Sequence, residues 1–230
     1  MKTAILINAR MGSKRLPGKH LRDVAGKKAI ERVIDRVNIG LPIIIATGCE
    51  SENCELKPIA IKNKVEIFFG DPANIPNRHL QIARHHKLDA VISIDADDLL
   101  TSNNALKCVI QDLERNMHLA KTSGLPLGMN VIWAYTTENL IKAIQNVKKG
   151  DARSTDTGWG WLFDGMLLST AQLQIAGADK IRATLDYPED LKFFRTVYQL
   201  CPKPIMDDDI KLCQWMMDNR VNNINKRWRE

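Results

Sequence analysis

The sequence has few of the features that mark membrane, secreted or zinc-binding proteins. No apolar run approaches the roughly 20 residues that span a membrane, and the N-terminus, MKTAILINAR, lacks the cleavage pattern of a signal peptide. The 5 cysteines lack the paired spacing of a zinc site, and their odd number suits a reducing compartment. We therefore expect a cytoplasmic protein without a membrane span.

Length and charge limit the possibilities further. The chain has 230 residues, a length that suits one domain, and 44% of them are hydrophobic, which is enough for a buried core. The formal net charge is +6 and the pI is about 9.1. This charge favours an anionic partner but does not distinguish nucleic acid from nucleotides or acidic sugars.

The N-terminal half alternates apolar strands with amphipathic helices. The predicted strands cover 3–9, 41–47, 65–69 and 89–95, and helical spacing appears at 30–37, 77–86 and 106–113. This order predicts an α/β fold with a mostly parallel sheet and right-handed crossovers. Ligands of such sheets bind beyond the carboxyl ends of the strands, so we expect the site there.

The second half is less regular. From about 117 to 180 the pattern loosens around two glycine-rich stretches and one helical stretch near 140–147, which favours an insertion within a single domain 1–230. A further strand is predicted at 181–185. Pro188 then begins a helix, and an acidic cap near Asp207 precedes a last one.

A basic, glycine-containing loop follows the first predicted strand. It holds five cationic side chains around Gly12 and Gly18, namely Arg10, Lys14, Arg15, Lys19 and His20. The glycine spacing differs from a Walker A loop, and His20 replaces its hydroxyl residue. The loop suits anion binding, because glycine permits close backbone approach and the cations neutralise charge. A solvated basic turn is the alternative.

Two groups of acidic residues are candidate metal ligands. Asp95, Asp97 and Asp98 lie together at a strand end, where their charges repel unless cations or amides compensate. Mg²⁺ needs only one or two carboxylates beside phosphate oxygens. Asp186 follows a predicted strand and precedes a helix. Solvated acids at Asp95–Asp98 and a helix cap at Asp186 are the alternative interpretations.

The basic loop also carries a family resemblance. ARMGSKRLPGKHL resembles the A-R-x-x-S-x-R-L-P-G-K signature of the SpsF-like sugar cytidylyltransferases, which are akin to the CMP-Kdo and CMP-sialate synthetases. Four further segments resemble this family in order: IIIATG, FFGDPANIPNRHLQIARHH, GLPLGMNV and RATLDYPEDL. Together the matches reach from Lys2 to about Leu200.

The resemblance implies a Rossmann-like, three-layer α/β/α nucleotidyltransferase fold of the GT-A-like type, with 117–180 as a sugar-binding and dimerisation insertion. It implies CMP transfer from CTP to a sugar acid (Kdo-, sialate-, pseudaminate- or legionaminate-like) for surface polysaccharide biosynthesis. It also implies Mg²⁺ as cofactor and a homodimer, with neither nucleic acid nor membrane as partner.

The same resemblance assigns roles to individual residues. The catalytic residues it implies are Arg10, Lys19, Asp97 and Asp186, of which Asp97 and Asp186 bind the metal. The nucleotide-binding residues are Ala9, Arg10, Gly12, Ser13, Lys14, Arg15, Lys19, Thr47, Arg78 and Asp95. The substrate-binding residues it implies are Gly124, Pro126, Gly128 and Asn130. Trp159 is a further substrate-binding candidate for a different reason, namely that its ring can stack on a sugar face, and closure of a small hydrophobic core is the alternative.

Some positions depart from the family pattern or fall outside it. Asp95 stands where relatives often carry Gln or Thr, and the usual R-E-H-V-T-type segment is not found. His79, His85 and His86 are too irregularly spaced for a metal set, so we expect them at the surface.

Two other functions fit parts of the sequence. The D-x-D pattern of Asp95–Asp97 fits a GT-A glycosyltransferase that uses a nucleotide diphosphate-sugar, although such an enzyme needs no triphosphate-holding loop. The basic pI fits a non-catalytic nucleic-acid-binding protein, but aromatic-plus-basic tracts of the RNA-binding kind are missing. The converging aspartates favour nucleotidyl transfer over both.

Overall fold

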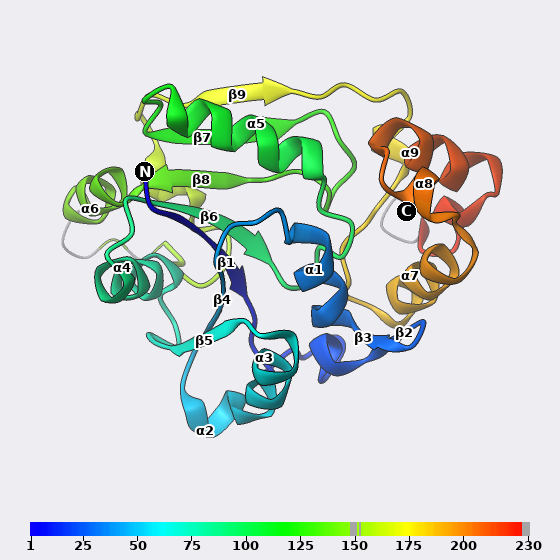
Figure 1. The fold of residues 1–230 in the computed structure, drawn as a ribbon, viewed down its shortest axis with the longest axis horizontal. Helices are drawn as coiled ribbons and strands as arrows, with labels where there is room; N and C mark the ends of the chain where they lie inside the picture. Colours follow the sequence, from blue (N-terminus) through cyan, green and yellow to red (C-terminus); the bar gives the residue numbers. More distant parts are fainter. Residues whose placement is uncertain (148–150, 152, 227–230) are drawn as a thin grey trace.

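The computed structural model describes residues 1–147, 151 and 153–226. Within this part of the chain, a seven-stranded sheet has the order β5-β4-β1-β6-β8-β7-β9 (Figure 1). The strands are β1 (Thr3–Asn8), β4 (Ile43–Thr47), β5 (Glu66–Phe69), β6 (Ala90–Asp95), β7 (Leu119–Ser123), β8 (Trp133–Thr136) and β9 (Ser169–Gln172). The four predicted strands of the N-terminal half are β1, β4, β5 and β6, and they are confirmed.

These four strands form the parallel half of the sheet. The register pairs Ile5 with Ile43 between β1 and β4, and Asn8 with Asp95 between β1 and β6. Most of their side chains are buried on both faces, as expected for the apolar runs of a covered parallel sheet. Because the strands are parallel and in this register, Asn8 and Asp95 end side by side at one edge.

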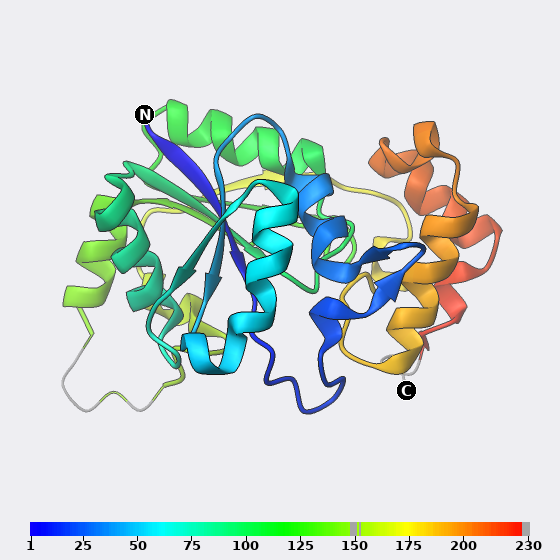
Figure 2. The ribbon, with the colours of Figure 1, turned by 60° about the horizontal axis from the view of Figure 1, so that its bottom comes forward.

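Helices cover both faces of the sheet, so the fold has three α/β/α layers (Figures 1 and 2). One face packs its core against α1 (Ala29–Val37), α3 (Lys57–Asn63) and α5 (Asn103–Glu114), and the other against α4 (Ile75–His86) and α6 (Thr137–Gln145). Alternation along β1 divides its side chains between these cores: Ile5 and Ile7 enter the first, Ala4 and Leu6 the second. The predicted fold class is confirmed.

The segment 117–180, expected as an insertion, supplies three strands of this same sheet. β8 lies antiparallel to β6 and to β7, and β9 lies parallel to β7. The loosened apolar pattern hid these strands, because they are short and partly exposed. The proposed part of this segment in sugar binding and dimerisation stays a prediction.

The predicted strand at 181–185 is wrong. Only Arg182 forms an isolated bridge, to Leu127, and the neighbouring backbone bonds join this stretch to two loops. Ala183 N–H donates to the Leu127 carbonyl at 2.7 Å, and Leu185 N–H donates to the Asp97 carbonyl at 2.9 Å. The apolar residues are buried, but they anchor the loop that leads to Asp186.

The C-terminal helices lie beside a small hairpin at one end of the molecule (Figure 1). They are α7 (Pro188–Leu200), α8 (Lys203–Met206) and α9 (Asp209–Asp218), and the hairpin comprises β2 (Asp23–Val24) and β3 (Lys27–Lys28). The predicted helix starts are confirmed: Pro188 opens α7, and the Asp208 carboxylate caps α9 by accepting from two backbone N–H groups. Over the described residues, no helix is long and apolar enough to cross a bilayer.

Shorter helical turns complete the fold. They are α2 (Glu50–Asn53) and the 3-10 turns η1 (Lys19–Leu21), η2 (Cys54–Leu56), η3 (Trp159–Phe163), η4 (Ala178–Lys180) and η5 (Val221–Asn223). The basic loop joins β1 to η1 and extends beyond the sheet (Figure 2). It therefore starts at the same sheet edge as the end of β6.

Candidate active site

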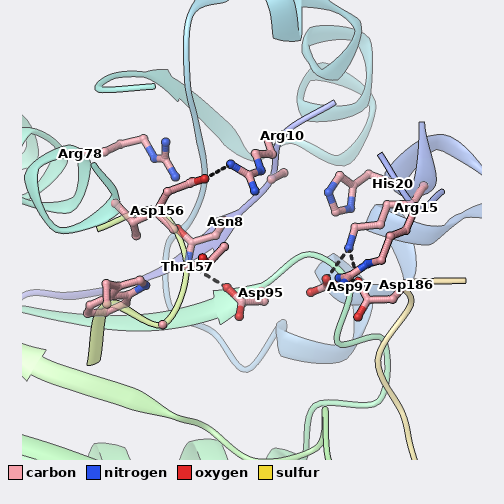
Figure 3. A pocket seen from close by; sticks show the side chains of 15 residues that line it. Asn8, Arg10, Arg15, His20, Arg78, Asp95, Asp97, Asp156, Thr157 and Asp186 are labelled. Atoms are coloured by element: carbon pink, nitrogen blue, oxygen red, sulfur yellow. Dashed lines mark hydrogen bonds and ion pairs between the residues drawn. The ribbon is translucent and has the colours of Figure 1, made fainter. Parts of the chain in front are cut away.

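A polar cavity of about 270 Å³ opens where β1 and β6 end (Figure 3). It combines four cationic side chains with four carboxylates from segments that are far apart in the sequence. Its lining residues are Asn8, Ala9, Arg10, Arg15, Lys19, His20, Ile75, Arg78, Asp95, Asp97, Asp156, Thr157, Gly158, Trp159 and Asp186.

One ammonium group joins two of the carboxylates. Lys19 Nζ lies 2.5 Å from Asp97 Oδ2 and 3.1 Å from Asp186 Oδ1. Burial alone would lower the pKa of Lys19, but the charges of Asp97 and Asp186 outweigh it and raise that pKa. Burial alone would raise the pKa of Asp186, but Lys19 and Arg15 hold it below its usual value. Lys19 and Asp186 are therefore both charged near neutral pH.

The backbone fixes the three members of this cluster. Gly18, with a φ of 63°, precedes the η1 turn that turns Lys19 inward. Asp97 follows β6 in a turn in which Asp98 N–H donates to the Asp95 carbonyl at 3.0 Å. The N–H of Asp186 donates to the Asp190 carboxylate at 2.9 Å, which holds Asp186 at the start of α7.

Arginines from two segments line the opposite side of the cavity. Arg10 leaves the end of β1 and forms an ion pair with Asp156, while Arg78 on α4 points toward the same carboxylate (Figure 3). Arg78 is buried and donates to the Asp71 carbonyl at 2.8 Å. The loop that carries Asp156 is held because Ile75 N–H donates to the Thr155 carbonyl at 2.9 Å.

The cluster at the end of β6 provides oxygen donors for a cation. Ligand atoms of Asp95, Asp97 and Asp98 all lie within 4.8 Å of one another. The pKa of Asp95 is raised to about 6, first because surrounding protein atoms displace water from its carboxyl group and then because of the charge of Asp97. Burial and the charges of Asp97 and Asp95 raise the pKa of Asp98 well above its usual value. Carboxylate oxygens are the ligands that Mg²⁺ prefers. The position between Asp97 and Asp186 already holds one positive charge, the ammonium of Lys19.

A second cavity, of about 190 Å³, adjoins the first and shares Asp95, Gly158 and Trp159 with it. Its other lining residues are Ser93, Ile94, Asp98, Asn130, Ile132, Trp133 and Gly160. Two indole rings, Trp133 and Trp159, lie with centroids 6.0 Å apart. The combination of ring faces, an amide and carboxylates suits a polyhydroxylated ligand.

Comparison with known proteins identifies the family. The family model described as cytidylyltransferase matches residues 4–159, which is more than half of the chain. The chain belongs to the cytidylyltransferase family. It is therefore a nucleotidyltransferase enzyme, as the basic loop and its resemblance predicted.

Individual relatives of this cytidylyltransferase are distant. The spore coat polysaccharide biosynthesis protein SpsF of Bacillus subtilis is 23% identical over 206 residues, covering 84% of this chain and 85% of the relative. A 3-deoxy-manno-octulosonate cytidylyltransferase 2 of Hydrogenovibrio crunogenus is 32% identical over 120 residues, covering 48% and 46%. A solved cytidylyltransferase from Leptospira borgpetersenii has a TM-score of 0.81 at 20% identity, covering 99% and 98%, and shows the shared fold.

The structure gathers most of the predicted site residues of this cytidylyltransferase. Those that line the first cavity are Ala9, Arg10, Arg15, Lys19, Arg78, Asp95, Asp97, Trp159 and Asp186. Asn130 lines the second cavity. Their roles stay predictions, but the spacing of the motifs did bring them to one edge of the sheet.

Other predicted site residues lie elsewhere. Those that line neither cavity are Gly12, Ser13, Lys14, Thr47, Gly124, Pro126 and Gly128. Thr47 is fully buried at the end of β4, and Lys14 is exposed on the loop. Gly128 packs so closely on the Ala183 carbonyl that a Cβ would lie 2.1 Å from its oxygen. This close packing explains why a glycine stands at position 128. The proposed contact of Gly128 with the sugar stays a prediction.

The sequence did not reveal several residues of the site. Asn8, Asp156 and Thr157 line the cavity, as does His20 of the basic loop, which was not assigned a role. The expectation that His79 lies at the surface is wrong, because it is fully buried behind Asn8. A polar Asn8 at the end of an apolar strand was a usable signal, whereas the position of Asp156 depends on how a long loop folds back.

Proposed function

We propose that this cytidylyltransferase transfers CMP from CTP to a sugar acid and releases pyrophosphate. The observation that carries the proposal is one cavity in which Arg10, Arg15, Lys19 and Arg78 face the carboxylates of Asp97 and Asp186. The names of two relatives, a 3-deoxy-manno-octulosonate cytidylyltransferase and a polysaccharide biosynthesis protein, support a sugar acid as acceptor.

The cationic side chains bind and orient the triphosphate. Arg10 and Arg15 are half-exposed and present their guanidinium groups to the cavity, where planar N–H pairs match phosphate oxygens. The acceptor hydroxyl attacks the α-phosphorus, the P–O bond to the β-phosphate breaks, and pyrophosphate leaves with that bond's electron pair. The hydroxyl proton passes to solvent or to a carboxylate at the end of β6. Positioning and charge neutralisation provide most of the rate gain in such transfers.

Asp97 and Asp186 would hold Mg²⁺. Bound there, the ion would neutralise phosphate charge and lower the pKa of a coordinated hydroxyl. Lys19 contacts both carboxylates, so it holds them together. We propose that Lys19 releases one of them when it binds a phosphate oxygen.

The second cavity is the candidate acceptor site. It adjoins the triphosphate cavity through Asp95 and Trp159, so an acceptor bound there lies next to the nucleotide. Asn130 donates through Nδ2 to the Leu125 carbonyl at 2.9 Å, which holds its side chain at the cavity wall. Family membership favours this reaction over glycosyl transfer and over non-catalytic nucleic-acid binding.

The test is pyrophosphate release from CTP, UTP, ATP and GTP with Mg²⁺, measured with and without 3-deoxy-manno-octulosonate and other keto-acid sugars. We expect release with CTP and one acceptor only. Asp97→Asn and Asp186→Asn should each reduce the rate at least about 100-fold, because each removes a proposed ligand of Mg²⁺. Asp35→Asn, a matched change to an exposed carboxylate on α1, should leave the rate unchanged.

Two outcomes would contradict the proposal. Turnover of a nucleotide diphosphate-sugar without CTP use would indicate glycosyl transfer. Salt-sensitive binding of nucleic acid without any nucleotide turnover would indicate a binding protein. A homodimer and a cytoplasmic location stay predictions, which light scattering and cell fractionation would test.

A further inference from the structure

A chain of hydrogen bonds leads from the buried core to Asp95, which lines both cavities. Tyr135 on β8 contacts His79 Nδ1 at 2.5 Å, and His79 Nε2 contacts Asn8 Oδ1 at 2.6 Å. Asn8 Nδ2 then donates to Ser93 Oγ at 2.9 Å and to Asp95 Oδ1 at 3.2 Å. Figure 3 shows the last link, with Asn8 beside Asp95.

The chemistry of Asp95 sets the direction of every bond in this chain. A carboxylate only accepts, so Asn8 must turn its Nδ2 toward Asp95 and its Oδ1 toward His79. Asn8 Oδ1 in turn requires a proton on His79 Nε2. His79 Nδ1 then carries no proton and accepts from the Tyr135 hydroxyl. Each atom has one role, and all the hydrogen-bonding atoms of the Asn8 amide are used.

His79 is held in a single place and charge state. It is fully buried, and its ring packs edge-on against Trp159 with centroids 5.8 Å apart. Burial and the charge of Arg78 lower its pKa to about 3, so the ring is neutral at physiological pH. A neutral, immobile imidazole with one N–H is a fixed donor to Asn8.

We propose that His79 is a positioning residue: through the Asn8 amide it fixes the Asp95 carboxylate as an acceptor for a ligand hydroxyl or amine. Asp95 lines both cavities, and its side chain is exposed to them. Asn8 satisfies Oδ1, which leaves Oδ2 to accept from the ligand. The inference rests on the proposed function for its ligands. The donor is either the exocyclic amine of cytosine or a group of the acceptor sugar.

Two substitutions at His79 separate its two hydrogen bonds. His79→Gln places an amide N–H near the position of Nε2 and keeps the donor to Asn8. His79→Asn is shorter, so it reaches Tyr135 but not Asn8. Tyr135→Phe removes only the hydroxyl and keeps the ring, and Asn8→Asp keeps the shape but cannot donate to Asp95.

We expect His79→Asn and Asn8→Asp each to weaken binding of one ligand about tenfold, the effect of losing one oriented hydrogen bond. His79→Gln and Tyr135→Phe should stay within about threefold of the wild type, and kcat should change less than KM in all four. Calorimetry without acceptor measures CTP and UTP binding to these variants. If CTP binding weakens and UTP binding does not, the cytosine amine is the donor. A rise in the acceptor KM with unchanged CTP binding identifies the sugar.

A spectroscopic measurement tests the same inference without turnover. Nitrogen-15 NMR of labelled imidazole should show the Nε2–H tautomer of His79 in the wild type. The Nδ1–H tautomer would overturn the proposal, as would equal losses in His79→Gln and His79→Asn, or ligand affinities unchanged in both His79→Asn and Asn8→Asp. If the wild type turns over no CTP with any acceptor, the proposed function fails, while the tautomer and the nucleotide-binding measurements still decide on His79.

Discussion

The ammonium of Lys19 lies 2.5 Å from the carboxylate of Asp97, although the two residues come from segments that are far apart in the sequence. The same ammonium contacts Asp186 at 3.1 Å. These carboxylates are also the proposed ligands of Mg²⁺. Because two cations repel, binding of the metal and the position of Lys19 are coupled.

The first prediction follows from this coupling. In Lys19→Met, two carboxylates lose their shared cation and the triphosphate loses a contact, so the rate of pyrophosphate release should fall about 10- to 100-fold. The affinity for Mg²⁺ alone should rise, because the competing ammonium is gone. Titration of Mg²⁺ against the thermal unfolding midpoint checks this. Lys27→Met, an exposed lysine on β3, is the control, and equal Mg²⁺ affinity in both variants would contradict the coupling.

Asp156 should restrain nucleotide binding. Its carboxylate pairs with Arg10 inside the cavity, where a triphosphate would compete for the same guanidinium. The pair is partly exposed, and such pairs contribute little, so Asp156→Asn should tighten CTP binding about two- to fivefold. Calorimetry of CTP binding in low salt measures this. Weaker binding in the variant would instead indicate that Asp156 contacts the nucleotide itself.

The fold was predictable wherever one apolar run made one buried strand. β1, β4 and β6 consist mostly of Ile, Leu, Val and Ala with both faces covered, and their order implied the parallel half of the sheet. The strand predicted at 181–185 also has apolar residues, Ile181, Ala183 and Leu185, and these are buried without a partner strand. An apolar run therefore predicts that a segment is buried. It does not predict that the segment is a strand, because a strand also needs a neighbouring strand to pair with, and that depends on the rest of the chain.

The site was predictable where it lies on motifs next to strand ends. Lys19, Asp97 and Asp186 came from such motifs, and they meet in the cavity. His79 was missed because the position of a single histidine in the sequence does not show whether it lies on the buried or the exposed face of α4. Asp156 was missed because nothing near it in the sequence specifies where its loop crosses the sheet edge.

Stability should depend on pH through His79. Its pKa is about 3 in the folded protein and near 6.5 when unfolded, so the unfolded chain binds more protons between these values. The contribution of His79 to the free energy of unfolding is fully present above about pH 6.5. Below that pH it falls by roughly 1.4 kcal/mol per pH unit. The difference in free energy of unfolding between wild type and His79→Gln should therefore narrow by about 2 kcal/mol from pH 6.5 to pH 5. Urea unfolding measures it.

His85→Gln is the control for that series, since His85 is exposed at the end of the same helix. The difference in free energy of unfolding between His85→Gln and the wild type should stay nearly constant over this pH range. A constant difference for His79→Gln as well would mean that the buried imidazole takes up a proton in the folded protein.

Gly128 should be required for folding rather than for ligand contact. It has a φ of 85°, which side chains rarely adopt, and a Cβ there would lie 2.1 Å from the Ala183 oxygen. Gly128→Ala should therefore lower the free energy of unfolding by about 2–4 kcal/mol, since the backbone bond between Ala183 and Leu127 must move. Chemical denaturation measures this loss directly.

Gly12→Ala is the matched change, because Gly12 has open space where a Cβ would lie. Its stability should stay within about 0.5 kcal/mol of the wild type, so any loss of activity there reports on the nucleotide rather than on folding. If Gly128→Ala instead kept wild-type stability and raised only the acceptor KM, the sugar contact implied by the GLPLGMNV motif would replace the packing explanation. The pair of variants thus separates a glycine needed by the fold from one needed by the ligand.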